Sequence, residues 1–259
     1  MDDHDELLKK AFATQAESYA HPLKARYLED VSPMIDLVQP LPSERLLDIG
    51  TGSGFTALGF AGRVKSVVGL DVSAAAVEVA KRQAAARGVA NAEFRVSGME
   101  TLPFAAGSFE IVTCRFVFHH FTNPGKVLLE MKRVLAPRGR IMLYDILTNP
   151  DDRMAEVHNR IEKARDPSHV RMLQAKEFMD LFRHSGLDVR AKDVLLTKRE
   201  FDEWMEIVGA DPETIRTTRA LLESSGDASG LGVWNTSGRI TFTQTNVAWL
   251  LVPSAAPTA

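Results

Sequence analysis

Apolar residues along the chain follow two spacings, one typical of amphipathic helices and one of short buried strands. From residue 6 to residue 38 they recur at helical spacing, and the pair His21-Pro22 interrupts this run, which predicts two helices. Short apolar runs then alternate with further helical stretches. The predicted strands are residues 45–49, 66–70, 93–96, 109–114 and 140–145, and the predicted helices between them are residues 53–62, 73–87 and 125–135.

This alternation predicts an α/β fold. Strands joined by single helices run parallel with right-handed crossovers, so we expect a doubly wound, mostly parallel sheet. The last third of the chain is less regular, with a charged helical stretch, a helix at 175–185, a strand at 187–196, two helical stretches and an apolar strand at 246–252. The connection between the two late strands differs from a simple helical crossover. We therefore expect about seven strands in all, with an antiparallel final strand.

Composition and charge narrow the class of partner. The 259 residues include 31 Lys and Arg against 34 Asp and Glu, a net charge of -3, so the chain has no excess positive field to hold nucleic acid. A single cysteine, Cys114, excludes an internal disulfide and fits a reducing cytosol. No apolar run approaches the roughly 20 residues that span a bilayer, and the acidic start is unlike a secretory signal. We expect a cytoplasmic protein that binds no nucleic acid and does not insert stably in a membrane.

The first predicted strand runs into a glycine-rich turn, LLDIGTGSG at residues 46–54. Glycines let the backbone turn tightly and approach a ligand with no side chain in between. A dinucleotide-binding fingerprint would need glycine at positions 50, 52 and 55, but position 55 is Phe, so the motif is G-x-G-x-G. Asp71 ends the second strand, where its carboxylate can accept both ribose hydroxyls of an adenosine. In the alternative Asp71 only caps the next helix, although Ser73 is available for that role.

The turn together with Asp48 resembles the first motif of the class I S-adenosylmethionine-dependent methyltransferases. Residues 98–104, 107–110 and 115–121 are similar to the third and fourth motifs of the small-molecule group, which includes the ubiquinone and menaquinone C-methyltransferases. The resemblance ends near Asp145 and implies a Rossmann-like methyltransferase fold with S-adenosylmethionine as cofactor. The implied cofactor-binding residues are Tyr19, Asp48, Gly50, Thr51, Gly52, Gly54, Asp71, Val72, Gly98, Met99, Glu100 and Arg115.

One position departs from the family pattern. After the third strand the family commonly has an acidic residue that accepts the adenine amino group, and the matching position here is Gly98. Adenine would then be held by packing on Met99 and by backbone groups, or by Glu100, and the sequence does not decide between them.

Pattern and resemblance together divide the chain into three parts. Residues 1–40 form an N-terminal helical arm, which resembles the lid of the family and carries Phe12 and Tyr19. Residues 41–148 form the cofactor-binding α/β core. Residues 149–259 supply helices that cover the substrate and the last two strands of the same sheet.

A pair of histidines marks the place where an acceptor would enter. Methyl transfer from a sulfonium is an in-line displacement, so positioning of the reactants is the enzyme's largest contribution. His119 and His120 follow the fourth predicted strand, and the usual pKa of histidine suits a catalytic base. Because consecutive residues of an extended chain point to opposite sides, we expect at most one of them to face the site. A structural role for the pair stays open. We expect no metal, because a strand places these residues and Cys114 poorly for a tetrahedral site.

The polar segment 159–171 follows the fifth strand, on the rim where this fold class builds its acceptor site. Its alternating charges could also be a solvated helix face, but the pair Asp166-Pro167 breaks the helix in the middle of a dense group of polar residues. Guanidinium groups match carboxylates and phosphates, which predicts a polar or anionic small-molecule acceptor. The predicted acceptor-binding residues are His119, Tyr144, Arg165, His169 and Arg171.

Other functions stay open at this point. A quinone-ring C-methyltransferase would need an apolar groove for the tail, and a non-catalytic S-adenosylmethionine-binding protein would show the same cofactor motifs. A nicotinamide oxidoreductase is disfavoured by the residue at position 55. A methyltransferase acting on nucleic-acid amino groups would carry Asn or Asp followed by Pro-Pro-Tyr after the fourth strand, where residues 114–117 read Cys-Arg-Phe-Val. Neither the methylated atom nor the oligomeric state follows from the sequence.

Overall fold

A computed structural model describes residues 6–9, 11–13 and 30–255 of the chain. Residues 6–9 and 11–13 are helical. The elements that follow are α3 (Ser32–Val38), β1 (Arg45–Ile49), α4 (Phe55–Ala61), β2 (Ser66–Asp71), α5 (Ala74–Ala86), β3 (Ala92–Val96), β4 (Phe109–Arg115), η1 (Phe118–His120), α6 (Pro124–Val134), β5 (Leu135–Leu147), α7 (Asp152–Arg165), α8 (Ala175–His184), β6 (Leu187–Glu200), α9 (Phe201–Ile207), α10 (Pro212–Ser225), η2 (Gly226–Ser229), β7 (Trp234–Thr236) and β8 (Arg239–Pro253).

One sheet organises these elements, in the strand order β3-β2-β1-β4-β5-β8-β6, with β7 paired to β8 beside this path. Strands β1 to β5 pair in parallel, whereas β8 lies antiparallel to both β5 and β6. The predicted α/β fold with an antiparallel final strand is therefore confirmed. The order reverses between β1 and β4, and ligands of open α/β sheets bind at such a point, beyond the carboxyl ends of the strands.

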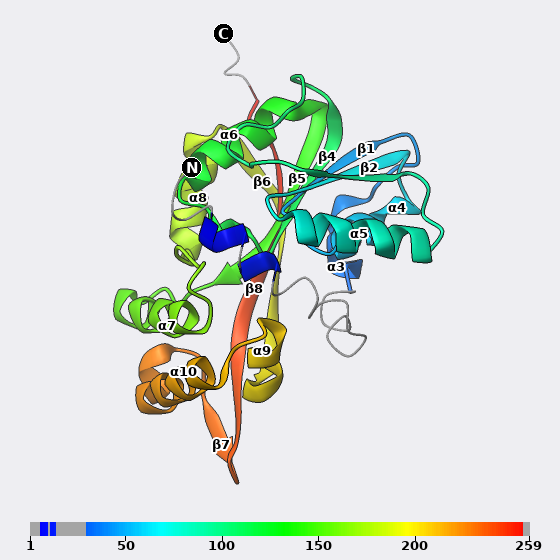
Figure 1. Cartoon of the computed structure of the whole chain (residues 1–259). Helices are drawn as coiled ribbons and strands as arrows, with labels where there is room; N and C mark the ends of the chain where they lie inside the picture. The colour runs from blue at the N-terminus through cyan, green and yellow to red at the C-terminus, as the bar shows by residue number, and fades with distance from the viewer. Residues whose placement is uncertain (1–5, 10, 14–29, 256–259) are drawn as a thin grey trace.

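Helices cover both faces of the sheet (Figure 1). Helices α3, α4 and α5 pack on one face, where Met34, Phe60 and Val77 join one apolar cluster with the sheet. Helices α6 and α8 pack on the other face, where Phe178 and Trp249 belong to a second cluster. The central parallel strands β1, β2 and β4 are largely buried between these layers, which explains why their sequences are short apolar runs, whereas most residues of the edge strand β3 are exposed.

The C-terminal part of the chain has a hydrophobic cluster of its own. Strands β6 and β8 extend beyond the rest of the sheet and carry α9 and α10 at their far end, beside α7 (Figure 1). Trp204 of α9, Leu222 of α10, Ile161 of α7 and Phe242 of β8 are buried together there. The two long strands thus attach a small second core to the main sheet.

Three strand predictions were too short and one strand was missed. β5 begins at Leu135, β6 ends at Glu200 and β8 begins at Arg239, all well outside the predicted bounds, and β7 was not predicted. In β8 the buried side chains of Ile240 and Phe242 alternate with less buried threonines, a period of two that indicates a strand with one covered face.

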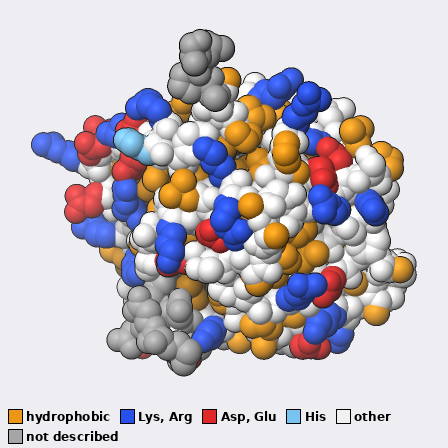
Figure 2. All heavy atoms as spheres, turned by 90° about the horizontal axis from the view of Figure 1, so that it is seen from above, with side chains coloured by type: hydrophobic (Ala, Val, Ile, Leu, Met, Phe, Trp, Pro, Cys, Tyr) orange, Lys and Arg blue, Asp and Glu red, His pale blue; other side chains and the backbone are white. Residues whose placement is uncertain are grey.

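The described surface shows basic and acidic side chains intermixed, with apolar patches between them, on the face drawn in Figure 2. None of the helices in the described ranges is long and apolar enough to cross a bilayer.

Candidate active site

The glycine-rich turn connects β1 to α4 at the point where the strand order reverses. Gly50 has a φ of +65°, and a Cβ built on it would lie 2.6 Å from a methyl group of Val117, so the chain leaves no room for a side chain there. Gly52 has a φ of +52°, and a Cβ built on it would have no other atom of the described structure within 4 Å. Its backbone therefore borders open space that a ligand could fill. Gly54 is the N-cap residue of α4, and a Cβ built on it would lie 3.1 Å from Cβ of Ala80 in α5. Close helix packing therefore explains the glycine at this position.

Asp71 lies at the carboxyl end of β2 and is 3% exposed. Its carboxylate accepts hydrogen bonds from the backbone N–H of Gly52 at 2.8 Å and of Ser73 at 2.9 Å. Ser73 caps α5 by accepting from the N–H of Ala76, so the alternative that Asp71 serves as the helix cap is wrong. Burial raises the pKa of Asp71 to about 6, although these backbone hydrogen bonds act to lower it.

Asp48 stabilises the glycine-rich turn through hydrogen bonds to its side chain. Its side chain is buried and accepts hydrogen bonds from the hydroxyls of Thr51 and Thr113, both at 2.7 Å. Burial raises its pKa to about 6, partly offset by these two hydrogen bonds. Asp48 therefore fixes the shape of the turn, whereas Thr51 lines the open space beside it.

One cavity joins the glycine-rich turn and Asp71 to several of the residues that were predicted to bind the acceptor. Of the predicted site residues, nine line it: Gly50, Thr51, Gly52, Asp71, Arg115, His119, His120, Arg165 and His169. The cavity wall also contains residues that were not predicted, among them Ser53, Thr56, Phe116, Asp166, Arg199, Trp204, Ile207 and Gln244. Phe12 of the N-terminal arm closes one side, with its ring edge on His120 at a centroid distance of 5.0 Å. Tyr19 lies outside the described residues.

Several predicted cofactor residues lie off this wall. Val72 packs against the apolar cluster of the sheet, and Met99 is buried in the same cluster. Glu100 pairs with Lys126 at 3.0 Å at the surface. Gly98 borders open space, with nothing within 4 Å of a Cβ built there.

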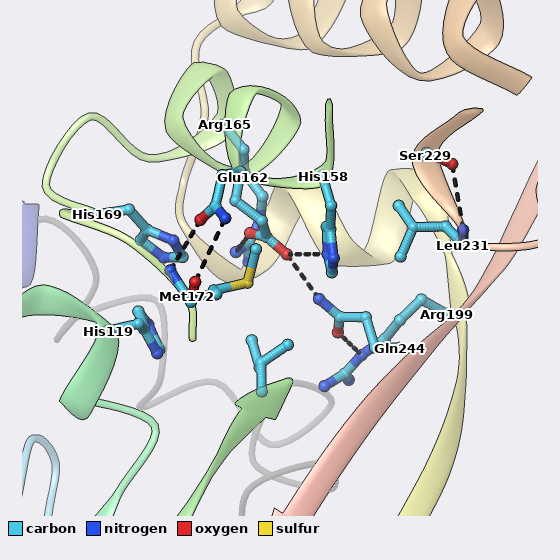
Figure 3. Close-up of polar contacts among 12 residues, drawn as sticks. His119, His158, Glu162, Arg165, His169, Met172, Arg199, Ser229, Leu231 and Gln244 are labelled. Carbon is cyan, nitrogen blue, oxygen red and sulfur yellow. Dashed lines mark hydrogen bonds and ion pairs between the residues drawn. The ribbon is translucent and has the colours of Figure 1, made fainter. Parts of the chain in front are cut away.

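Three histidine rings lie close together in the wall of the cavity. His119 and His120 lie in η1, a 3₁₀ turn, so both rings face the cavity and the expectation that only one would do so is wrong. His169, from the loop after α7, completes the group (Figure 3). The ring centroids of His119 lie 4.3 Å from those of both His120 and His169. The loop after α7 folds back against η1, where the N–H groups of Val170 and Arg171 donate to the carbonyl oxygen of His119.

Hydrogen bonds hold two of these rings in place. Nδ1 of His119 lies 2.5 Å from an Oδ atom of Asp145, which is 1% exposed at the end of β5. Nδ1 of His120 lies 3.1 Å from the carbonyl oxygen of Ser168. Burial acts to lower the pKa of His119, but the carboxylate of Asp145 outweighs it and the pKa is raised. Burial and the neighbouring His119 lower the pKa of His120 and of His169, so these two rings are neutral near pH 7.

A buried polar network lies beyond the histidines (Figure 3). Glu162 of α7 accepts from Nε2 of Gln244 at 2.7 Å, and Oε1 of Gln244 accepts from Arg199 at 2.8 Å. Arg165 lies 3.4 Å from Glu162 and its guanidinium carbon is 4.4 Å from the ring centroid of Trp204. Arg165, Arg199 and Gln244 line the cavity, whereas Glu162 binds two of them from outside its wall.

Two predicted acceptor residues are not in the cavity wall. Arg171 is exposed and pairs with Glu177 at 2.6 Å. Tyr144 packs behind Phe116, with ring centroids 4.9 Å apart. Arg115, predicted to bind the cofactor, lies over both of these rings and does line the cavity.

Comparison with known proteins identifies the family. A family model described as a methyltransferase domain matches residues 47–143. The chain is 35% identical over 195 residues to the uncharacterized methyltransferase YcgJ of Bacillus subtilis, covering 75% of this chain and 77% of that protein. The crystal structure of YcgJ matches with a TM-score of 0.83 at 29% identity, covering 89% of this chain and all 100% of that one. The ubiquinone/menaquinone C-methyltransferase UbiE of Geotalea daltonii is 36% identical over 111 residues, 41% of this chain and 47% of that protein. The chain belongs to the S-adenosylmethionine-dependent methyltransferases, which confirms the resemblance.

Proposed function

We propose that the protein transfers the methyl group of S-adenosylmethionine to a small-molecule acceptor that carries a polar or anionic group. One observation carries this proposal: a single cavity joins the Gly50–Gly52 turn and Asp71 to the histidines and arginines on the other side. A cofactor at the first end and an acceptor at the second would share one enclosed space. In-line displacement requires this proximity, and alignment of two reactants supplies about 7–11 kcal/mol of the reduction in barrier.

The residues at the first end fit the cofactor. Asp71 retains lone pairs that can accept the two ribose hydroxyls, because a carboxylate has about four acceptor sites. Gly52 leaves its side of the turn open for the ligand backbone. Arg115 lines the same space and offers a cation to the carboxylate of the methionine part. When bound, S-adenosylmethionine supplies a methyl group on a positively charged sulfur.

His119 is placed to accept the proton of the acceptor. Its Nδ1 is bonded to Asp145, so the ring is held in one orientation and its other nitrogen, Nε2, can act as base. The carboxylate also stabilises the imidazolium that forms when the proton arrives. His120 is neutral because burial lowers its pKa, and we propose that it positions the acceptor beside His119.

The far end of the cavity defines the acceptor class. Arg165 and Arg199 bring guanidinium groups to its wall, and Gln244 between them adds an amide. An acceptor with a carboxylate or phosphate would pair with these groups. Trp204 and Ile207 add an apolar side, which favours a second candidate in which a phenolic or quinol ring lies against them. That candidate agrees with the relatives named for quinone biosynthesis.

Turnover of labelled methyl groups tests the proposal. The protein is incubated with methyl-labelled S-adenosylmethionine and a small-molecule metabolite extract, and labelled products are separated by mass. We expect a labelled polar product, and an anion-exchange step before the assay shows whether the acceptor is anionic. Calorimetric binding of the cofactor without any labelled product across extracts and a phenol and quinol panel would instead identify a non-catalytic cofactor-binding protein. Tight binding of a nicotinamide dinucleotide would contradict the proposal.

Cofactor affinity is expected to fall in mild acid. Asp71 must be ionised to accept two hydroxyls, and burial raises its pKa to about 6. Above that pH the carboxylate is charged and binding is at full strength, whereas at pH 5 only about one molecule in ten is ionised, so the dissociation constant rises about tenfold. Calorimetry from pH 5 to pH 8 measures this. The variant Asp71→Asn does not titrate, so most of the slope should disappear in it, and an unchanged slope would assign the effect to another group such as Asp48.

A further inference from the structure

The histidine cluster, His119, His120 and His169, offers more than a base. One nitrogen of each ring lies within 4.8 Å of the corresponding nitrogens of the other two. All three side chains are buried, and all three line the cavity. We propose that this cluster binds a divalent transition-metal ion, contrary to the expectation from the sequence that the protein holds none.

The partners of the rings are those that metal-binding histidines use. Such a histidine characteristically bonds through its second nitrogen to a carboxylate or a backbone carbonyl, which fixes the tautomer and the direction of the metal-binding nitrogen. Asp145 fills this role for His119, and the carbonyl of Ser168 fills it for His120. Nδ1 of His169 is buried and has no hydrogen-bond partner within the described part of the chain. An ion would satisfy that nitrogen.

The surrounding charge also favours a cation. The carboxylates of Asp145, Glu162 and Asp166 are buried and act on His119 from three sides. Arg165, between Glu162 and the cavity, offsets part of this negative charge.

Three imidazoles define the class of ion and its role. Imidazole suits zinc, cobalt, nickel, copper and iron, and three protein ligands with one open position are typical of catalytic zinc sites. Metal–nitrogen distances of about 2.0–2.1 Å place ligand nitrogens about 3.3 Å apart in a tetrahedron, so the rings must close by about 1.5 Å. This role rests on the proposed function: an ion held here would bind a hydroxyl of the acceptor at the open position and lower its pKa, and the proton would leave to solvent water. His119 would hold the ion in the metal-loaded protein and act as the base only in the metal-free protein.

Metal binding can be measured directly on the full chain. The protein is stripped with a chelator, dialysed and titrated with Zn²⁺ by calorimetry and with Co²⁺ by visible absorption. We expect one ion per chain and the ligand-field bands of Co²⁺ in nitrogen coordination. His169→Ala should lose binding by at least tenfold, and Asp145→Asn, which removes only the partner of His119, should weaken it about 10–100-fold.

His184→Ala is the matched control, because this histidine is exposed at the C-terminal end of α8 and is not a member of the cluster. It should bind both ions as the unchanged protein does. Binding of S-adenosylmethionine to the same samples shows that each variant is folded. Absence of a stoichiometric ion, or equal binding in His169→Ala and the unchanged protein, would overturn the metal site. Methyl transfer by chelated protein at full rate would overturn its role in catalysis and leave the proposed function intact.

Discussion

Replacement of Asp71 by alanine is expected to weaken the binding of S-adenosylmethionine by about 10²–10⁴-fold. Two hydrogen bonds from ribose hydroxyls to one carboxylate would be lost, and bonds to a charged group contribute about 1.5–3 kcal/mol each. The carboxylate also accepts from Gly52 and so helps to hold the glycine-rich turn. Calorimetric titration measures the dissociation constant. The effect should lie in affinity, so that kcat at saturating cofactor falls far less.

Asp180→Ala provides the comparison, since this aspartate is exposed on α8 and its carboxylate pairs with Arg183 at the surface. Its cofactor affinity should equal that of the unchanged protein. A thermal unfolding curve for Asp71→Ala checks that the fold persists. If a folded Asp71→Ala protein bound the cofactor within threefold of the unchanged protein, the ribose site would have to be sought elsewhere in the cavity.

Replacement of Asp145 by asparagine is expected to lower kcat by about 10²–10⁴-fold, the usual contribution of a positioned base. Asparagine keeps the shape of the side chain but removes the charge that raises the pKa of His119 and stabilises its protonated ring. Steady-state turnover of the acceptor identified by labelling measures this loss. The cofactor contacts lie at the other end of the cavity, so the affinity for S-adenosylmethionine should stay within about twofold.

The double variant with His119→Ala separates positioning from a purely structural effect. If Asp145 acts through His119, adding Asp145→Asn to His119→Ala should lower kcat no further, because residues that act as a unit are non-additive. A further loss in the double variant of the same size as in the single one would show that Asp145 acts on the fold or on another group. Its hydrogen bond from the N–H of Phe118 makes that outcome a real alternative.

The parallel half of the fold could be predicted closely from the sequence. Its central strands β1, β2 and β4 are largely buried and therefore read as short apolar runs, and the helices between the strands have regular apolar spacing. In the edge strand β3 the buried Phe94 lies between the exposed Glu93 and Arg95. The predicted 45–49 strand matches β1, and the predicted 175–185 helix matches α8 to within one residue. The bounds of β6 and β8 were harder to predict, because the outer parts of these strands are covered on one side only. Polar residues therefore alternate with apolar ones there, and the sequence resembles that of a loop.

The part of the site that lies at the ends of neighbouring strands could be predicted from the sequence. Gly50, Gly52 and Asp71 lie at the ends of adjacent parallel strands, so spacing alone places them side by side. His169 lies beside His119 because the loop after α7 folds back against η1. Arg199 contacts Gln244 because the long strands β6 and β8 pair beyond the main sheet. Such contacts depend on tertiary packing across many residues. Asp145 did leave a signal, as an acidic residue at the end of a buried parallel strand.

The ribbon formed by β6 and β8 supplies part of the cavity wall, including Arg199 and Gln244, at the end where we propose that the acceptor binds. The family model matches residues 47–143 and stops before the ribbon begins, and the ribbon carries helices α9 and α10 with a hydrophobic core of their own. Mutations in that small core can reshape the wall around Trp204 without altering the backbone that surrounds Asp71. Evolution within the family can therefore exchange one methyl acceptor for another while the cofactor half is inherited unchanged.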